Sequence, residues 1–205
     1  MTYLDETNKI KAWLKAGSIN IFGRPFAGKD TQGRLLAELF DGTLLGGGDI
    51  LRASTLPNHV EEAMKAGELI PTEEYIQIVL PFLSKQEHSA RPLILSSVGR
   101  WSGEENGVIE ATKASEHPMK AVIYLELNED QVRERWNNLH ETSDRGLRHD
   151  DTAEVLEARL NEYRNKTLPV LAHYKAMGLL VTIDGSQTPE VVHEEILAKL
   201  FELAN

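Results

Sequence analysis

The sequence of 205 residues contains no cysteine, which excludes disulfides and thiolate metal ligands. It also lacks long hydrophobic runs, and none approaches the roughly 20 apolar residues that a membrane-spanning helix needs. The N-terminal stretch MTYLDETNKIKAWLKAG has acidic residues near its start and no long apolar segment, unlike a secretory signal. We therefore expect a cytoplasmic protein that does not associate with membranes.

An excess of positive charge is also missing, because the formal net charge is -10. Domains that bind nucleic acid or anionic membranes usually carry a basic surface, so neither partner is expected here. A phosphate ligand would have to be held by a local group of basic side chains, against the repulsion of the net charge.

Hydrophobic residues make up 41% of the chain and charged residues 26%, a composition typical of one globular domain with a sizeable core. Apolar, β-branched runs predict buried strands at 18–22, 43–45, 92–97, 121–127 and 179–184. Helical spacing is found around Ile10 and in 28–40, 72–86, 129–139, 152–177 and 189–203, with Pro169 expected to kink or split its helix. Strands that alternate with helices predict an α/β fold: a five-stranded parallel sheet with helices on both faces.

The strongest motif joins a strand, a glycine-bounded loop and the start of a helix, between Ile19 and Gln32. In this context the backbone N–H groups of the loop can bind phosphate oxygens, and Lys29 can reach the outer phosphates of a nucleotide. Gly23 and Gly28 stand where a side chain would block the turn or the close approach of the ligand. Ordinary phosphate loops have Ser or Thr after the lysine, whereas this chain has Asp30.

Further motifs follow in one order along nearly the whole chain. Gly28-Lys29-Asp30-Thr31-Gln32 resembles the GKGTQ opening of adenylate kinases, and Gly48-Asp49-Ile50-Leu51-Arg52 resembles their GDxLR element. The later matches are Ala66–Pro71 to the GxLVP turn, Ser96–Arg100 to DGFPR, Glu141–Asp151 to a short zinc-free lid, Arg159–Tyr163 to RLxxY, Leu168–Tyr174 to TxPLIxYY and Asp184–Ser186 to the DG loop. Several spaced motifs in one order are more specific than a single phosphate loop, and the chain is identified as a member of this family.

The resemblance implies a P-loop kinase fold with a core of residues 1–55, 87–139 and 152–205, a small lobe that binds the nucleoside monophosphate at 56–86, and a short lid at 140–151. It implies the reaction ATP + AMP ⇌ 2 ADP with Mg²⁺ bound to ATP. The partners expected are therefore ATP and a nucleoside monophosphate, with AMP favoured, and we expect a monomer.

The resemblance also assigns roles to residues of this chain. Lys29, Arg100, Arg148 and Arg159 are the expected catalytic cations, because in-line phosphoryl transfer needs positive charge on the migrating group rather than a nucleophilic side chain. The ATP site would comprise Gly23, Pro25, Ala27, Gly28, Lys29, Asp30, Thr31, Arg135 and Gln187. The monophosphate site would comprise Gly47, Asp49, Arg52, Gly99, Arg100 and Glu104.

One departure from the family concerns magnesium. The acidic residue of DGFPR is replaced by Ser96, whereas Asp30 brings a carboxylate to the phosphate loop. We interpret Asp30 as the replacement for the lost acid, with Asp49 as a second acidic neighbour that acts through water. The alternative is that Asp30 only favours the helix N-terminus.

Other departures affect catalysis and specificity. Leu139 stands where the family has another lid-side arginine, so a phosphate contact is missing or comes from Arg145, and Phe26 replaces a small loop residue. Glu104 replaces the glutamine that reads adenine, and Gly47 replaces a side chain that lines the same pocket. Because a carboxylate only accepts hydrogen bonds, a kinase for GMP or for UMP/CMP stays open as an alternative.

A second alternative is a nucleotide sensor that has kept the pocket and lost turnover. Ser96 and Leu139 favour it, whereas the full set of basic residues opposes it. A GTPase or motor ATPase is opposed by the missing Walker hydroxyl after Lys29 and by the absence of an NKxD motif. Arg24 could contact phosphate or point to solvent, and His140 and His149 are expected to be solvated or capping residues rather than metal ligands.

Overall fold

The computed structural model describes residues 2–83, 85, 88, 90–142 and 152–205. Its centre is a sheet of five parallel strands in the order β2-β3-β1-β4-β5. The strands are β1 (Ser18–Gly23), β2 (Thr43–Gly46), β3 (Leu93–Ser96), β4 (Met119–Glu126) and β5 (Leu180–Asp184). All five lie where the apolar runs predicted strands, and the predicted α/β fold is confirmed.

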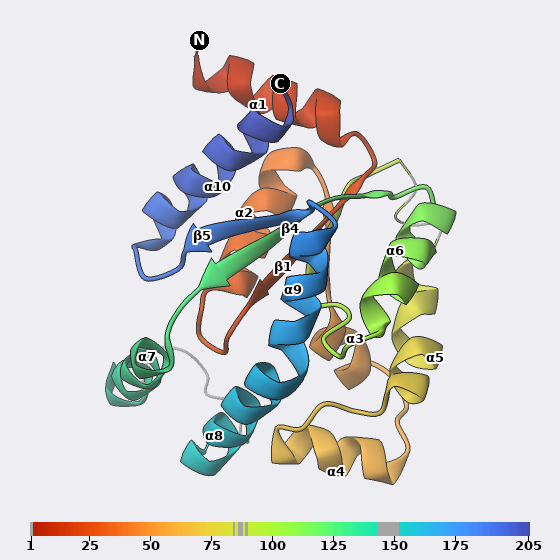
Figure 1. Ribbon diagram of the computed structural model, residues 1–205, viewed down its shortest axis with the longest axis vertical. Coiled ribbons are helices and arrows are strands. Elements are labelled where there is room, and N and C mark those ends of the chain that lie inside the picture. Colours follow the sequence, from red (N-terminus) through yellow and green to blue (C-terminus); the bar gives the residue numbers. More distant parts are fainter. Residues whose placement is uncertain (1, 84, 86–87, 89, 143–151) are drawn as a thin grey trace.

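Helices cover both faces of this sheet (Figure 1). On one face lie α1 (Tyr3–Leu14), α2 (Lys29–Phe40) and α10 (Pro189–Leu203), and on the other α5 (Thr72–Leu83), α6 (Glu104–Ala114) and α9 (Leu168–Ala176). The remaining helices surround the carboxyl ends of the strands: α3 (Gly47–Arg52), α4 (Asn58–Ala66), α7 (Glu129–Thr142) and α8 (Ala153–Glu162). The sequence analysis did not predict α3 or α6.

The alternation of side chains along each strand explains why both faces are buried. Ile19 and Ile21 of β1 lie in the core cluster under α1, α2 and α10, whereas Phe22 lies in the cluster under α9. In β4, Val122 and Ile123 divide in the same way. Successive strand residues point to opposite faces, so a strand covered by helices on both sides must be apolar throughout.

The predicted helix 152–177 is continuous in space but not uniform. After α8 the chain forms one π-helical segment, η2 (Tyr163–Thr167), before α9 begins. In this segment the N–H of Leu168 donates to the carbonyl of Tyr163, five residues earlier. Pro169 therefore stands in the first turn of α9, where its missing N–H costs little.

The carboxyl ends of parallel strands all meet at one edge of the sheet, and the motifs of the sequence follow those ends. The phosphate loop follows β1, α3 follows β2, the segment 97–103 follows β3, and Gly185 follows β5. Part of the predicted lid, residues 143–151 with Arg145, Arg148 and His149, lies outside the described residues. None of the helices within the described ranges is long and apolar enough to cross a membrane.

Candidate active site

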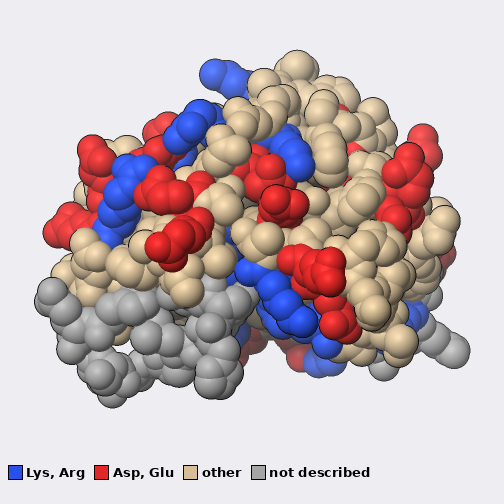
Figure 2. Space-filling view, turned by 90° about the horizontal axis from the view of Figure 1, so that it is seen from below, with Lys and Arg blue, Asp and Glu red and all other residues tan. Residues whose placement is uncertain are grey.

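A cavity of about 1330 Å³ opens at the carboxyl edge of the sheet. Many of the predicted site residues line it: Gly23, Pro25, Gly28, Lys29, Asp30, Thr31, Gly47, Asp49, Arg52, Arg100, Glu104, Arg135 and Arg159. Ala27, Gly99 and Gln187 are not among its lining residues, and Arg148 is not described. From the side of α4, α7 and α8, basic side chains gather near the middle of the face, with acidic side chains around them (Figure 2).

The phosphate loop is shaped by left-handed backbone at two positions. Gly28 has φ +91°, and Phe26 has φ +62°, a conformation that is costly for a bulky residue. Lys29 Nζ donates to the carbonyl of Arg24 at 2.9 Å, so the lysine folds back over the loop that it follows. The loop thus encloses a small space bordered by backbone and by one ammonium group, as a phosphate requires.

Arg24 takes neither of the two orientations considered from the sequence. Its Nη1 donates to the carbonyl of Leu127 at 2.7 Å and to the Tyr124 hydroxyl at 3.3 Å, and its guanidinium lies 5.3 Å from the centre of the Tyr163 ring. The side chain therefore points away from phosphate and from solvent, and it fastens the phosphate loop to the end of β4.

Asp30 and Ser96 are hydrogen-bonded, although 66 positions separate them in the sequence. Ser96 Oγ donates to Asp30 Oδ1 at 3.0 Å, and the carboxylate is otherwise exposed toward the cavity. The acid in the phosphate loop thus lies against Ser96, the position at the end of β3 where the family has its acid. Within the described part of the chain, no three His, Asp or Glu side chains gather as a metal-binding group, so nucleotide phosphates and water would have to complete any magnesium shell.

Arg135 of α7 joins the phosphate loop to the loop after β5. Its two terminal nitrogens donate to the carbonyls of Phe26 at 3.1 Å and Gly185 at 2.7 Å. Gln187 donates to Asp184 Oδ2 at 3.0 Å, and hydrogen bonds from Ser186 and Gln187 lower the pKa of the Asp184 carboxyl to about 2. These contacts order the segment in which the resemblance expects the ATP base.

At the other end of the cavity lie the arginines of the expected monophosphate site. Arg52 forms an ion pair with Asp49, one turn earlier in α3. Burial lowers the pKa of the Arg100 guanidinium, an effect opposed by the negative charge of Glu104 and by Tyr75. A desolvated guanidinium gains strongly from an anionic ligand that replaces its lost water, as a phosphate would.

Tyr75 and Thr72 of α5 are two residues of this region that the sequence analysis missed. The Tyr75 hydroxyl accepts a hydrogen bond from the N–H of Gly99 at 2.8 Å. It also lies 3.0 Å from the place that a Cβ on Gly47 would occupy. The tyrosine thus fills the space left by the glycine, a complementarity that a single sequence does not reveal because the two residues lie on different elements.

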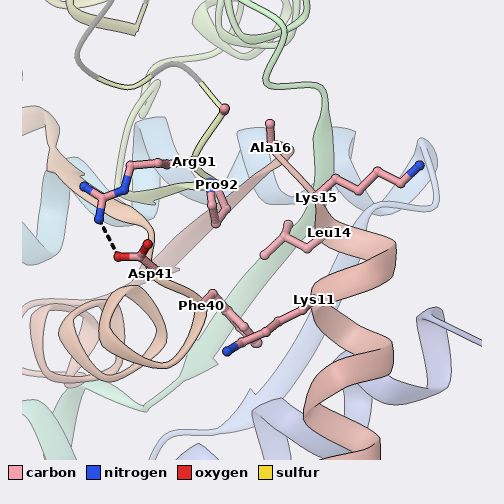
Figure 3. Close-up of a pocket in the computed structure, with 9 residues that line it drawn as sticks. Lys11, Leu14, Lys15, Ala16, Phe40, Asp41, Arg91 and Pro92 are labelled. Atoms are coloured by element: carbon pink, nitrogen blue, oxygen red, sulfur yellow. Dashed lines mark hydrogen bonds and ion pairs between the residues drawn. The ribbon is translucent and has the colours of Figure 1, made fainter.

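A second cavity, of about 440 Å³, lies at the opposite edge of the sheet (Figure 3). Lys11, Lys15, Phe40 and the ion-paired Asp41 and Arg91 border it. Two helices, α1 and α2, end there, and the partial negative charge of their C-termini offsets the basic side chains.

Comparison with known proteins agrees with this geometry. A family model described as adenylate kinase matches residues 21–179. The chain belongs to the adenylate kinase family. It is 34% identical to an adenylate kinase of Rhizobium meliloti, over 85% of this chain and 94% of the relative, and 32% identical to that of Agrobacterium fabrum, over 85% and 92%. The adenylate kinase of Thermus thermophilus is 29% identical over 91% of this chain and 99% of its own.

The similarity covers most of each chain and confirms the resemblance that the sequence motifs indicated. The protein is therefore a nucleoside-monophosphate kinase that carries out phosphotransfer of the adenylate kinase type. Its GKDTQ opening, with Asp30, and its Ser96 lie within the matched region, so both departures belong to a member of the family.

Proposed function

We propose that this kinase catalyses ATP + AMP ⇌ 2 ADP, with Mg²⁺ bound to the triphosphate. The observation that carries the proposal is that one cavity is lined both by Lys29 of the phosphate loop and by the arginines Arg52, Arg100 and Arg159. Such a cavity can hold the triphosphate at one end and the monophosphate at the other, with cations around the group that moves.

The chemistry follows from this arrangement. An oxygen of the monophosphate attacks the γ-phosphorus of ATP, the bond from that phosphorus to the β-phosphate oxygen breaks, and two diphosphates result. Lys29 stabilises charge on the outer phosphates, and Arg52 and Arg100 hold the attacking phosphate in line. Arg159 completes the positive surface, and Arg148, in the undescribed segment, is expected to act from the lid.

We propose that Asp30 and Asp49 face the magnesium ion through water. Both carboxylates line the cavity, and Asp30 accepts a hydrogen bond from Ser96, the residue that replaces the family's acid. This pair of oxygen donors fits Mg²⁺, which keeps several waters and usually takes one or two carboxylates in addition to phosphates. When bound, the ion would neutralise charge on the β- and γ-phosphates.

AMP is the proposed acceptor because each of the relatives compared is named adenylate kinase. Other acceptors were considered because Glu104 and Gly47 replace residues of the family's adenine pocket, but both oxygens of the Glu104 carboxylate accept hydrogen bonds from the protein. The monophosphate lobe, the lid, the monomeric state and the cytoplasmic location stay predictions.

A coupled assay for diphosphate formation tests the proposal, with ATP, Mg²⁺ and each of AMP, GMP, CMP and UMP. We expect turnover with AMP to exceed turnover with the other three by at least tenfold. Preference for GMP or a pyrimidine nucleotide would assign a different acceptor. Tight nucleotide binding without turnover would contradict the enzyme proposal and identify a sensor.

A further inference from the structure

The segment between β3 and α6, which carries Arg100, is held by side chains from two helices. Three consecutive backbone N–H groups, those of Gly99, Arg100 and Trp101, each donate to a side chain. Consecutive N–H groups in a loop could bind an anion directly, but here all three are already used by the protein. The contribution of this segment to phosphate binding therefore comes from the Arg100 side chain.

Glu104, the first residue of α6, accepts two of these three hydrogen bonds. Its Oε2 accepts from the N–H of Arg100 at 2.9 Å and from that of Trp101 at 3.0 Å. Its Oε1 accepts from the Thr72 hydroxyl at 3.2 Å, which ties the segment to α5. Glu104 is 3% exposed. Hydrogen bonds to a carboxylate that is shielded from water are stronger than hydrogen bonds between neutral groups.

Tyr75 accepts the third of these hydrogen bonds. Its hydroxyl accepts from Gly99, and the residue is 6% exposed. Burial raises the pKa of the Tyr75 phenol, so it stays neutral at any physiological pH. Tyr75 and Thr72 lie one turn apart at the start of α5, so one end of this helix fixes both Gly99 and Glu104.

The segment needs such support because its backbone is unfavourable by itself. Ser97 has φ +52° and Gly99 has φ +76°, so two left-handed residues flank Val98 just before Arg100. Backbone in these regions persists when the surrounding structure determines it. Val98 adds two hydrogen bonds to Asn20 of β1: its carbonyl accepts from Asn20 Nδ2 at 2.7 Å, and its N–H donates to Asn20 Oδ1 at 3.3 Å. After Val98, the backbone N–H groups of residues 99–101 are held by hydrogen bonds to Tyr75 and Glu104.

We infer that Glu104 is a positioning residue for Arg100, acting together with Thr72 and Tyr75, and that it does not read the base of the monophosphate. This inference rests on the proposed function, since it concerns the same monophosphate site. The distinction has a measurable consequence. Arg100 acts on the phosphate, which every nucleoside monophosphate has, so loss of its support lowers activity toward all of them by one factor. Loss of a base-reading group changes the ratios among them.

The experiment compares E104A and E104Q with the unchanged enzyme, using AMP, GMP, CMP and UMP. E104A leaves two N–H groups without their acceptor, and we expect kcat/KM to fall about 10- to 100-fold with every monophosphate that reacts. The KM for ATP should stay within about twofold. In E104Q the amide oxygen can still accept from the segment and the amide nitrogen can donate to Thr72, so the loss should be at most about threefold.

Two further variants separate positioning from a general loss of structure. Glu105, the next residue, is also buried, but it binds the N–H of Gly103 at 2.6 Å and His173 at 2.7 Å rather than residues 99–101. E105A should leave the KM for AMP near its original value, and thermal unfolding will show whether each variant folds. Y75F removes the acceptor for Gly99 and should raise the KM for AMP without changing base preference, even if E104A does not fold.

Changed ratios among the four monophosphates in E104Q or E104A would overturn the inference, as would an equal loss in E105A. If the unchanged enzyme turned over no monophosphate, the proposed function would fail separately. The inference would then be tested by calorimetric binding of AMP. Weaker binding in E104A but not in E105A would support it, and equal binding in all three proteins would overturn it.

Discussion

The two ends of the active-site cavity are built by different means. At the phosphate-loop end, the turn itself is local: Lys29 Nζ donates to the carbonyl of Arg24, five residues earlier, and Gly28 supplies the left-handed backbone. Arg24 and Arg135 add hydrogen bonds that join this turn to distant parts of the chain. At the monophosphate end, the segment before α6 is held by Tyr75 and by Glu104 with Thr72, across 24 and 32 positions of the sequence. A site made of local contacts is recognisable as a motif, whereas a site made of distant contacts depends on the fold.

Both ends contain strained backbone, yet they support it differently. Phe26 with φ +62° lies against the main core cluster, and its carbonyl accepts from Arg135. Ser97 with φ +52° is buried, and the backbone N–H groups that follow it donate to acceptors on α5 and α6. Packing and polar contacts together therefore support the backbone at one end, whereas directed polar contacts hold it at the other, so substitutions should affect the two ends in different ways.

The largest effect is expected at the phosphate loop. Lys29→Ala removes the ammonium group that stabilises the outer phosphates, and kcat should fall by roughly 10²- to 10³-fold, as for loss of one preorganised donor. The coupled assay with AMP measures this. The matched control is Lys199→Ala, on the exposed face of α10 and paired with Glu202, which should leave kcat unchanged. A loss of less than threefold in Lys29→Ala would contradict the role of this lysine.

A methyl group added at Gly47 should weaken the binding of AMP without affecting that of ATP. In Gly47→Ala the new Cβ would lie 3.0 Å from the Tyr75 hydroxyl and 3.1 Å from the Ser97 carbonyl, contacts so tight that a neighbouring atom must shift by a few tenths of an ångström. Overpacking of this kind costs about 1–3 kcal/mol, which corresponds to a rise of roughly 5- to 100-fold in the KM for AMP. The KM for ATP should not change.

In the double variant with Y75F and Gly47→Ala, the rise in the KM for AMP should be smaller than the product of the two single effects, because the atom nearest to the new Cβ is then removed. The double-mutant cycle over both single variants measures the coupling of the two residues. If the two substitutions had strictly additive effects on the KM for AMP, Gly47 and Tyr75 would act independently. The contrast between the two ends of the cavity would then be weakened.

Asp30 and Ser96 lie between the two ends, and exchanging them tests the proposed magnesium role. Asp30→Asn removes the charge while keeping the shape, and the Mg²⁺ concentration for half-maximal activity should rise about tenfold, or about 1.4 kcal/mol. The exchange D30S/S96D restores one carboxylate to the same hydrogen-bonded pair and should recover most of the loss. Unchanged magnesium dependence in Asp30→Asn would leave only a helix-capping role for this residue.

Two glycines with similar backbone separate stability from function at the phosphate-loop end. Gly28 has φ +91° and Gly178 has φ +72°, and an added Cβ would meet no atom within 4 Å at either position. Alanine at each should therefore lower the free energy of unfolding by about 1–2 kcal/mol through backbone conformation alone. Thermal unfolding measures this, and activity should fall further only in G28A. Equal activity in both variants would show that the loop tolerates the distortion.

The smallest effect concerns the support behind α2. His193 of α10 lies 3.0 Å from the side-chain oxygen of Gln32, and burial lowers the pKa of this histidine below its usual 6.5. The unfolded chain then takes up the proton first, so the stabilisation is complete above pH 6.5 and declines as the pH falls below it. Thermal unfolding at pH 7.5 and 5.5 should show a smaller decrease in His193→Gln than in the unchanged protein. An equal decrease would assign the pH dependence to other groups.

Much of this enzyme was determined by local sequence. Apolar runs that suit burial on both faces fixed the five strands, and the glycines around Lys29 fixed the phosphate loop, because both depend on neighbouring residues alone. The order of the motifs indicated the family before any contact was known. Pro169 was expected to kink or split its helix, but the π-helical segment that accommodates it was not predicted, since its hydrogen-bond pattern depends on the packing of Tyr163 and Thr167.

The tertiary structure decided the features that depend on distant partners. Arg24 points inward because the Tyr124 hydroxyl of β4 and the carbonyl of Leu127, just after β4, lie within its reach, 100 and 103 positions away in the sequence. The resemblance places Glu104 at the position of a base-reading residue, yet its oxygens accept hydrogen bonds from Arg100, Trp101 and Thr72. The sequence determines the chemical groups of each side chain. The hydrogen-bond partners of those groups depend on which elements the fold brings together, and a single sequence does not give the distances between residues that lie far apart in the chain.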